Sequence, residues 1–242
     1  MTISPLELAP GIAIGGGHFP VIAGPCVIES AETTFRAAEL LAGIAQRLGL
    51  KLIFKASFDK ANRSSGKAFR GPGLVEGLKV LAEVRRQFFL PLLTDVHEPA
   101  QCAPAAEVVD VLQIPAFLCR QTDLLLAAAA TGRAINVKKG QFMAPDDMRR
   151  VVDKIRAAGN DKVTVTERGA SFGYHNLVVD MRSFAWMQQD GIPVIYDVTH
   201  SLQLPGASAE GTGGAREFTE PLLSALLRVR IAVSARAELL LI

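Results

Sequence analysis

Short runs of β-branched and apolar residues recur along the chain, and each ends in polar side chains before a segment with helical spacing begins. These runs cover residues 21–24, 51–54, 90–93, 109–112, 134–137, 163–166 and 193–196. They follow one another at intervals of roughly 20 to 40 residues, which leaves room for one helix after each strand. The alternation predicts an α/β fold built on a parallel sheet.

The polar residues at the strand ends separate two α/β architectures. A doubly wound sheet concentrates its ligand residues where the strand order reverses. A barrel of eight strands collects them from the carboxyl ends of all its strands, and here nearly every run ends in such side chains. We therefore predict a (β/α)8 TIM barrel. Residues 206–214, rich in glycine, serine and alanine, are predicted to form a mobile loop over its mouth.

The eighth strand–helix unit is predicted to be incomplete. After a helical pattern over residues 217–227, the tail at residues 228–242 is atypical. Residues 238–242 are expected to form a short closing strand, and the sequence supplies no polar strand end or helix after them. We predict a single barrel domain over residues 1–242, because one barrel commonly reaches this length.

Charge and cysteine content limit the partners of the chain. A formal net charge of +2 predicts neither a nucleic-acid nor a membrane surface. No apolar run approaches the roughly 20 residues that span a bilayer, and the N-terminus lacks the pattern of a secretory signal. The three cysteines, Cys26, Cys102 and Cys119, form no disulfide framework and fit a reducing cytoplasm.

Cations are concentrated at the strand ends and in the loops after them: Lys55, Lys60, Lys138, Lys139 and Arg168, with Arg63 and Arg120. Burying so many positive charges requires anions that neutralise them. Arg168, which follows Glu167 at the end of the run 163–166, can hold a phosphate or carboxylate through two parallel hydrogen bonds. Any single lysine is equally compatible with a solvated surface. The set as a whole predicts a pocket for a small substrate with several negative charges.

Two further chemistries are compatible with the strand ends. Cys26 ends the first run and His200 follows the seventh, so a barrel would make them near neighbours, and thiolate with imidazole suits zinc or an iron-like divalent ion. Two ligands do not by themselves define a metal site. A lysine at a strand end, Lys55 or Lys138, could instead form a Schiff base. The residues alone leave both alternatives open.

Six long motifs resemble one family, and the resemblance extends over about residues 5–220. They are residues 22–30 (IAGPCVIES), 54–65 (FKASFDKANRSS), 93–98 (LTDVHE), 113–123 (QIPAFLCRQTD), 136–141 (NVKKGQ) and 197–205 (DVTHSLQLP). They are similar to the 3-deoxy-D-manno-octulosonate 8-phosphate synthases, also called 2-dehydro-3-deoxyphosphooctonate aldolases. The resemblance implies a homotetrameric barrel enzyme that condenses phosphoenolpyruvate with D-arabinose 5-phosphate and water, for the sugar acid of lipopolysaccharide.

The resemblance also implies a role for each matching residue. Lys60 and Ser57 contact the phosphoenolpyruvate carboxylate, and Lys55, Lys138 and Arg168 hold its phosphate. Gln113 and Ala116 line the same pocket. The residues that bind the aldose phosphate, partly across a subunit interface, are Asn62, Arg63 and Ser64. Asp95 and His97 lie near the reacting carbons and the attacking water.

Cys26 and His200 resemble two ligands of the metal-dependent branch of this family, which uses zinc, iron or manganese. The family continues through an eighth strand ending in a Glu-x-His-Pro-like motif and a loop with Asp in a Ser-Asp-Gly context. That Glu and Asp complete the metal site, and residues 228–242 contain neither motif. The resemblance therefore implies weak metal binding and reduced activity.

Three alternatives remain from the sequence. The first is a catalytically impaired relative that still binds phosphoenolpyruvate. The second is the related synthase that uses erythrose 4-phosphate, although residues 60–64 read KANRS where that enzyme usually has KPRT. The third is a Schiff-base aldolase.

Overall fold

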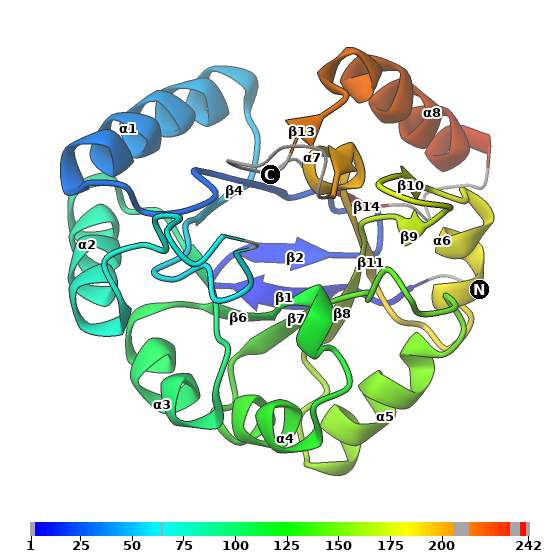
Figure 1. The fold of residues 1–242 in the computed structure, drawn as a ribbon, viewed down its shortest axis with the longest axis horizontal. Helices are drawn as coiled ribbons and strands as arrows, with labels where there is room; N and C mark the ends of the chain where they lie inside the picture. Colours follow the sequence, from blue (N-terminus) through cyan, green and yellow to red (C-terminus); the bar gives the residue numbers. More distant parts are fainter. Residues whose placement is uncertain (1–2, 64, 206–212, 233–237, 241–242) are drawn as a thin grey trace.

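The computed structural model describes residues 3–63, 65–205, 213–232 and 238–240. Eight parallel strands form one sheet in the order β14-β11-β8-β7-β6-β5-β4-β3. Their bounds are β3 Val21–Ala23, β4 Leu52–Lys55, β5 Leu92–Asp95, β6 Val111–Ile114, β7 Ala134–Lys138, β8 Val163–Glu167, β11 Val194–Asp197 and β14 Glu238–Leu240. The sheet curls until its end strands, β14 and β3, contact each other (Figure 1). The predicted barrel is confirmed.

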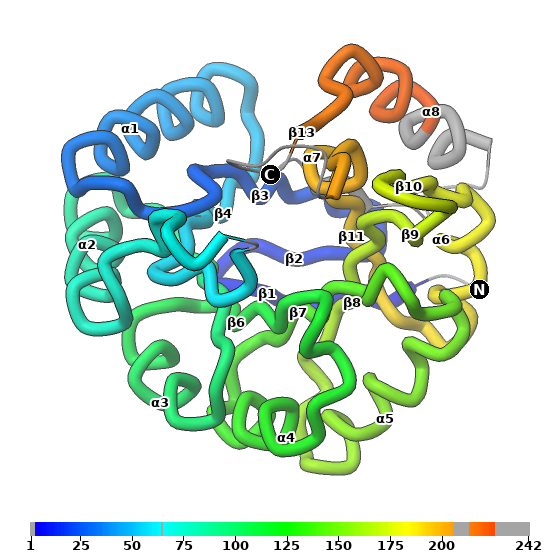
Figure 2. Tube along the Cα trace, viewed as in Figure 1, coloured from blue at the N-terminus to red at the C-terminus, as the bar shows by residue number. Residues whose placement is uncertain are grey.

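Helices surround the curled sheet, as the tube in Figure 2 shows. They are α1 Ala31–Leu48, α2 Leu74–Phe88, α3 Pro99–Val108, α4 Thr122–Ala130, α5 Met148–Ala157, α6 Arg182–Met187 and α8 Thr219–Ala232, while the four-residue α7 Val198–Ser201 directly follows β11 and lies inside this ring. The first of them shows how the sequence sets its ends. The Ser30 side chain accepts a hydrogen bond from the backbone of Thr33, and Gly49 ends the helix with a φ of 64°.

A hairpin missed in the sequence lies at the amino-terminal end of the barrel. Strands β1 (Leu6–Ala9) and β2 (Ile12–Ile14) pair antiparallel. Apolar side chains of the hairpin pack against residues near the starts of the barrel strands, including Ile53, Leu93 and Ile195. A second, larger core fills the space between the sheet and the helices. Because the hairpin fills the amino-terminal end, the carboxyl ends of the strands are left to form the site.

Most barrel strands begin later than the apolar runs predict. Pro91 has no backbone N–H, so β5 starts at Leu92 and extends to Asp95. Strands β4, β7 and β11 also end one residue later than the runs predict. Lys55, Lys138 and Asp197 are therefore the last residues of their strands and not the first residues of loops. Their positions are therefore fixed by the hydrogen-bonded ladder of the barrel.

The tail is only partly described. Helix α8 continues to Ala232, and β14 pairs with β11 where a closing strand was expected. Of the predicted loop at 206–214, residues 206–212 lie outside the described residues, while β13 (Gly213–Gly214) pairs with β12 (Gln203–Leu204). None of the described helices is long and apolar enough to cross a membrane.

Candidate active site

A cavity of about 470 Å³ opens at the carboxyl ends of the strands. Most residues predicted from the sequence line it: Cys26, Lys60, Asn62, Arg63, Asp95, His97, Gln113, Ala116, Lys138, Arg168 and His200. Lys55 and Ser57 are fully buried and contact Asp95 without being among the lining residues. Ser64 lies outside the described residues. The barrel thus brings side chains from all six sequence motifs to one cavity.

Asp95, at the end of β5, joins four predicted residues. Lys60 Nζ lies 3.0 Å from Asp95 Oδ2, and Lys55 Nζ lies 3.8 Å from Asp95 Oδ1. The Ser57 hydroxyl donates a hydrogen bond to the same carboxylate, and His97 Nε2 lies 3.9 Å from it. Burial opposes ionisation of Asp95, but the charges of Lys60 and Lys55 outweigh it and hold its pKa far below the usual range. Asp95 therefore remains a carboxylate that fixes two lysines.

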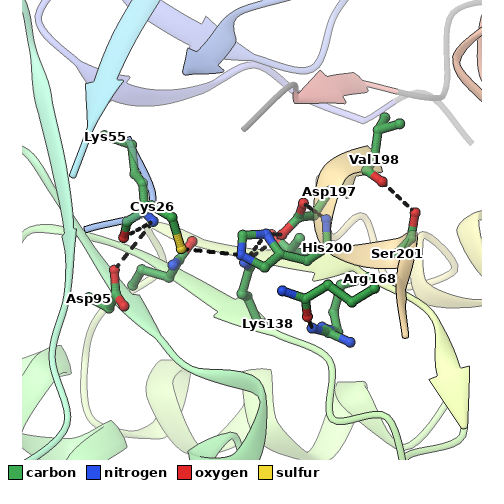
Figure 3. A network of polar contacts seen from close by, with 12 residues as sticks. Cys26, Lys55, Asp95, Lys138, Arg168, Asp197, Val198, His200 and Ser201 are labelled. Atoms are coloured by element: carbon green, nitrogen blue, oxygen red, sulfur yellow. Dashed lines mark hydrogen bonds and ion pairs between the residues drawn. The ribbon is translucent and has the colours of Figure 1, made fainter. Parts of the chain in front are cut away.

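Asp197, at the end of β11, forms a second cluster (Figure 3). Its Oδ2 lies 2.5 Å from Lys138 Nζ and 2.8 Å from His200 Nδ1. The backbone N–H of His200 donates to Asp197 Oδ1 over 2.9 Å. On the other side of the imidazole ring, His200 Nε2 lies 3.7 Å from Cys26 Sγ. The predicted proximity of Cys26 and His200 is confirmed.

Positive charge around Cys26 favours its thiolate. Partial burial raises the pKa of Cys26, but the hydrogen bond with His200 and the charges of Lys55 and Lys60 outweigh it and lower the pKa to about 5. The pKa of Lys55 is lowered as well. Its burial and the neighbouring Lys60 lower its pKa to about 8, although Asp95 opposes this. The cluster therefore places a thiol and a lysine, both with lowered pKa values, next to each other.

Arg168 has hydrogen-bond donors that the described residues leave unused. Its side chain is 5% exposed, and only Nη2 has a hydrogen bond among the described residues, to Gln203 Oε1 over 2.8 Å. Nε and Nη1 are buried without a partner in that part of the chain. Buried charged donors without acceptors are costly, and Arg168 lines the cavity, so its two unpartnered nitrogens indicate an anionic ligand there. Figure 3 shows the guanidinium beside the Asp197 cluster.

The expectation that external anions neutralise all the strand-end cations is wrong in part. Lys139 Nζ lies 3.4 Å from Glu167 Oε1, and both side chains are buried. Glu167 also accepts a hydrogen bond from the backbone of Gly169 over 2.7 Å. Of the five strand-end cations, three line the cavity, namely Lys60, Lys138 and Arg168. Lys60 and Lys138 are already paired with Asp95 and Asp197. The unused charge is centred on Arg168.

The residues present supply only part of a metal site. Cys26 and His200 are two suitable donors, and Asp197 holds the second ring nitrogen of His200, as carboxylates do for metal-binding histidines. No group of three or more His, Cys, Asp or Glu that could hold a metal ion exists in the described ranges. Zinc ordinarily takes about four ligands. The described donor set is therefore incomplete.

Sequence reasoning missed four polar residues. Asp197 was visible only as a strand end, although its position three residues before His200 in one helical turn is a usable signal. Gln141 and Gln203 line the cavity, and Gln141 Oε1 is buried without a described hydrogen-bond partner. Asn136 lies in the middle of β7 and is fully buried. Neutral amides give no charge pattern, so no signal in one sequence distinguishes them from ordinary polar residues.

Alkylation of the metal-free protein is expected to modify Cys26 alone. Cys26 is exposed and its pKa is about 5, whereas Cys102 and Cys119 are buried. Burial raises the pKa of Cys102 to about 11. Iodoacetamide at pH 7 followed by mass spectrometry should therefore give one adduct, and urea should release the other two thiols. Equal labelling of all three in the native protein would contradict this arrangement.

Comparison with known proteins agrees with the site. The model of the DAHP synthetase I family matches residues 3–233. The chain is 60% identical over 227 residues to the 2-dehydro-3-deoxyphosphooctonate aldolase of Trichlorobacter lovleyi, covering 93% of this chain and 84% of the relative. The enzyme of that name from Pelobacter propionicus is 62% identical over 211 residues, covering 87% and 78%. The one from Acidithiobacillus ferrooxidans is 55% identical over 223 residues, covering 92% and 79%.

The family model covers most of the chain, and the relatives carry the name to which the six motifs pointed. The resemblance drawn from those motifs is thereby confirmed. The chain belongs to the DAHP synthetase I family and, within it, groups with the 2-dehydro-3-deoxyphosphooctonate aldolases.

Proposed function

We propose that this protein condenses phosphoenolpyruvate with D-arabinose 5-phosphate and water, giving 3-deoxy-D-manno-octulosonate 8-phosphate and phosphate for lipopolysaccharide synthesis. The name that its relatives share, 2-dehydro-3-deoxyphosphooctonate aldolase, supports this activity. The observation that carries the proposal is the buried Arg168, whose two unpartnered N–H groups require an anion in the cavity. A carbon–carbon bond-forming synthase with two phosphorylated substrates supplies such anions.

In this proposal the predicted residues divide into three groups. Arg168 and Lys138 bind the phosphate of phosphoenolpyruvate, with Gln113 and Ala116 lining the pocket. Lys60 faces its carboxylate, and the buried Ser57 supports Lys60 by accepting a hydrogen bond from its Nζ over 2.6 Å. Asn62, Arg63 and Ser64 bind the aldose phosphate. Asp95 and His97 lie beside the reacting carbons. Lys55 acts from beneath the cavity, since its buried Nζ contacts the Cys26 carbonyl at 3.4 Å and Asp95 at 3.8 Å.

The proposed reaction needs no covalent bond to the enzyme. The nucleophilic carbon of phosphoenolpyruvate adds to the aldehyde carbon, water attacks the cationic centre that develops at the enol carbon, and phosphate leaves from the resulting hemiketal. The fixed lysines and Arg168 contribute by orienting both substrates and stabilising the phosphate as it leaves. Burial lowers the pKa of His97 despite nearby Asp95, so a neutral imidazole is available to accept the proton of the water.

We propose Cys26 and His200 as the ligands of a divalent ion, zinc, iron or manganese. A bound ion of this kind is a Lewis acid that polarises an oxygen atom. Because the described residues supply only two donors, we expect binding to be weak. Protection of Cys26 from iodoacetamide by added zinc tests this without reference to activity, and labelling that stays unchanged at millimolar zinc would contradict it.

Assembly and location are part of the same proposal. We propose a single-domain chain that forms a cytoplasmic homotetramer. Large apolar side chains in the loops after the strands support an interface there: Phe142, Phe172 and Tyr174 are 60%, 69% and 95% exposed. Light scattering of the purified protein gives the oligomeric state directly.

A Schiff-base mechanism is not favoured by the positions of the two candidate lysines. Lys55 is fully buried and outside the cavity lining, and Lys138 Nζ is held by Asp197 at 2.5 Å. Borohydride reduction in the presence of pyruvate should therefore leave every lysine unlabelled in the mass spectrum. A barrel aldolase that forms an imine serves as the positive control. A pyruvate adduct on Lys55 or Lys138 would contradict the proposed mechanism.

The experiment that tests the function is phosphate release from phosphoenolpyruvate. We expect release that depends on arabinose 5-phosphate, exceeds release with erythrose 4-phosphate, and falls with EDTA. The incomplete donor set favours one alternative, a chain that retains the anion pocket without turnover. Calorimetric binding of phosphoenolpyruvate with no release under zinc, iron or manganese would establish that alternative.

A further inference from the structure

A buried hydrogen-bond network crosses three barrel strands beneath the cavity. Asn136 on β7 lies opposite Gln113 on β6 and Thr164 on β8 in the ladder. Asn136 Nδ2 donates to Gln113 Oε1 over 3.1 Å. Asn136 Oδ1 accepts from the hydroxyls of Thr166 at 2.7 Å and Thr164 at 3.1 Å. All of these residues except Gln113 are fully buried, and Gln113 alone lines the cavity.

The threonine hydroxyls determine which way the two amides point. Thr166 is fully buried, and among the described residues its hydroxyl has no acceptor other than Asn136 Oδ1. Turning the Asn136 amide over would leave that buried O–H without an acceptor, which is costly. Thr164 differs, because its hydroxyl also lies 3.4 Å from the carbonyl of Ile135. Thr166 therefore fixes the orientation, and Thr164 adds to it.

The orientation passes from Asn136 to Gln113. With Asn136 Nδ2 donating, Gln113 Oε1 is occupied as an acceptor, and the remaining polar group, Nε2, is left for the cavity. Nε2 has no acceptor within the described ranges. The cavity beside it is lined by Lys60, Lys138 and Arg168, so an anionic oxygen placed there meets one more N–H donor. The opposite orientation would present a carbonyl oxygen to the same anion.

We propose that Asn136 is a positioning residue that, held by Thr166, turns the Gln113 N–H donor towards the bound phosphoenolpyruvate. Asn136 touches neither the cavity nor the substrate and acts only through Gln113. This inference rests on the proposed function for its ligand. It makes Asn136, which lies behind the lining residue Gln113, a determinant of the affinity for phosphoenolpyruvate.

Two variants of identical chemistry separate positioning from stability. Thr166→Val and Thr164→Val each remove one buried hydroxyl from neighbouring sites on β8. In Thr166→Val the Asn136 amide is free to turn, so the dissociation constant for phosphoenolpyruvate should rise on the order of tenfold. In Thr164→Val the orientation survives, so it should change by less than about twofold. Asn136→Asp, which cannot donate to Gln113, should lose at least as much affinity as Thr166→Val.

The measurement is calorimetric titration of the full chain with phosphoenolpyruvate, together with urea unfolding of each variant. Weakened binding in Thr166→Val and Asn136→Asp, with Thr164→Val close to the wild type and the two valine variants equally stable, supports the proposal. Equal binding by both valine variants overturns the positioning role and leaves the proposed function intact. A wild-type chain that does not bind phosphoenolpyruvate overturns both.

Discussion

Replacement of Arg168 by methionine is expected to weaken phosphoenolpyruvate binding strongly without lowering the stability of the protein. Removing one charged partner from a buried, hydrogen-bonded ion pair costs about 2 to 5 kcal/mol of binding free energy, or roughly thirtyfold to several thousandfold in affinity. Arg168 belongs to this class because its unused Nε and Nη1 are buried at the cavity. Calorimetric titration of Arg168→Met with phosphoenolpyruvate measures the loss.

The stability of the same variant should stay constant or increase. In the absence of ligand, Arg168 is a buried cation with a single described hydrogen bond, to Gln203. Methionine has a similar length and carries no charge to desolvate, so the loss of that bond is offset by relief of a buried charge. A structural arginine would behave in the opposite way. Lower unfolding free energy with unchanged phosphoenolpyruvate affinity would contradict the assignment.

Two further substitutions make the comparison sharper. Arg168→Lys keeps the charge but cannot form two parallel hydrogen bonds to a phosphate, so its affinity should fall between wild type and Arg168→Met. Arg150→Met removes an arginine of α5 whose side chain is 85% exposed, and neither affinity nor stability should change measurably.

Most of the site residues predicted from the sequence line the cavity. Parallel strands in a barrel bring their carboxyl ends to one mouth, so a polar residue at each strand end is enough to place Cys26 beside His200. The identity of the ion pairs could not be predicted. Side chains alternate between the two faces of a strand, so small shifts in strand bounds change which neighbour a side chain meets.

Lys138 and Lys139 show this difference between neighbours. Lys138 lines the cavity and contacts Asp197, whereas the next side chain turns the other way and contacts Glu167. Glu167 and Arg168 separate in the same way, although the sequence presented them as one charged pair. The cavity therefore carries less free positive charge than the sequence predicts, because carboxylates of the same chain occupy most of the lysines. Arg168 is left as the clearest anion-binding group.

Replacement of Asp95 by asparagine is expected to destabilise the protein by about 3 to 5 kcal/mol, the usual cost of removing one partner from a buried ion pair. Lys60 and Lys55 would lose the carboxylate that lies 3.0 Å and 3.8 Å from them. Urea unfolding at pH 7 measures the change. Asp59→Asn is the matched control, since its partner Arg70 has a side chain that is 58% exposed and such pairs contribute about 1 kcal/mol or less.

The stability difference between the wild type and Asp95→Asn should also depend on pH. The pKa of Asp95 is depressed in the folded protein, so its contribution to stability is complete above its unfolded pKa of about 3.9 and is lost as the pH falls further. The wild type should therefore approach the stability of Asp95→Asn as the pH is lowered below about 4. A constant difference between the two proteins down to the acid-unfolding limit would show that Asp95 stabilises the fold by packing and not by charge.

A second substitution distinguishes the missing charge from the missing hydrogen bonds. If the cost of Asp95→Asn comes from uncompensated lysines, adding Lys60→Met removes one of them and should recover part of the lost stability. Lys60→Met alone should cost less than Asp95→Asn, because Lys55 then keeps its carboxylate. Activity should not return in the double variant, since Lys60 lines the cavity and is proposed to face the substrate carboxylate. Recovery of stability without activity would separate the structural role of this cluster from its role in binding.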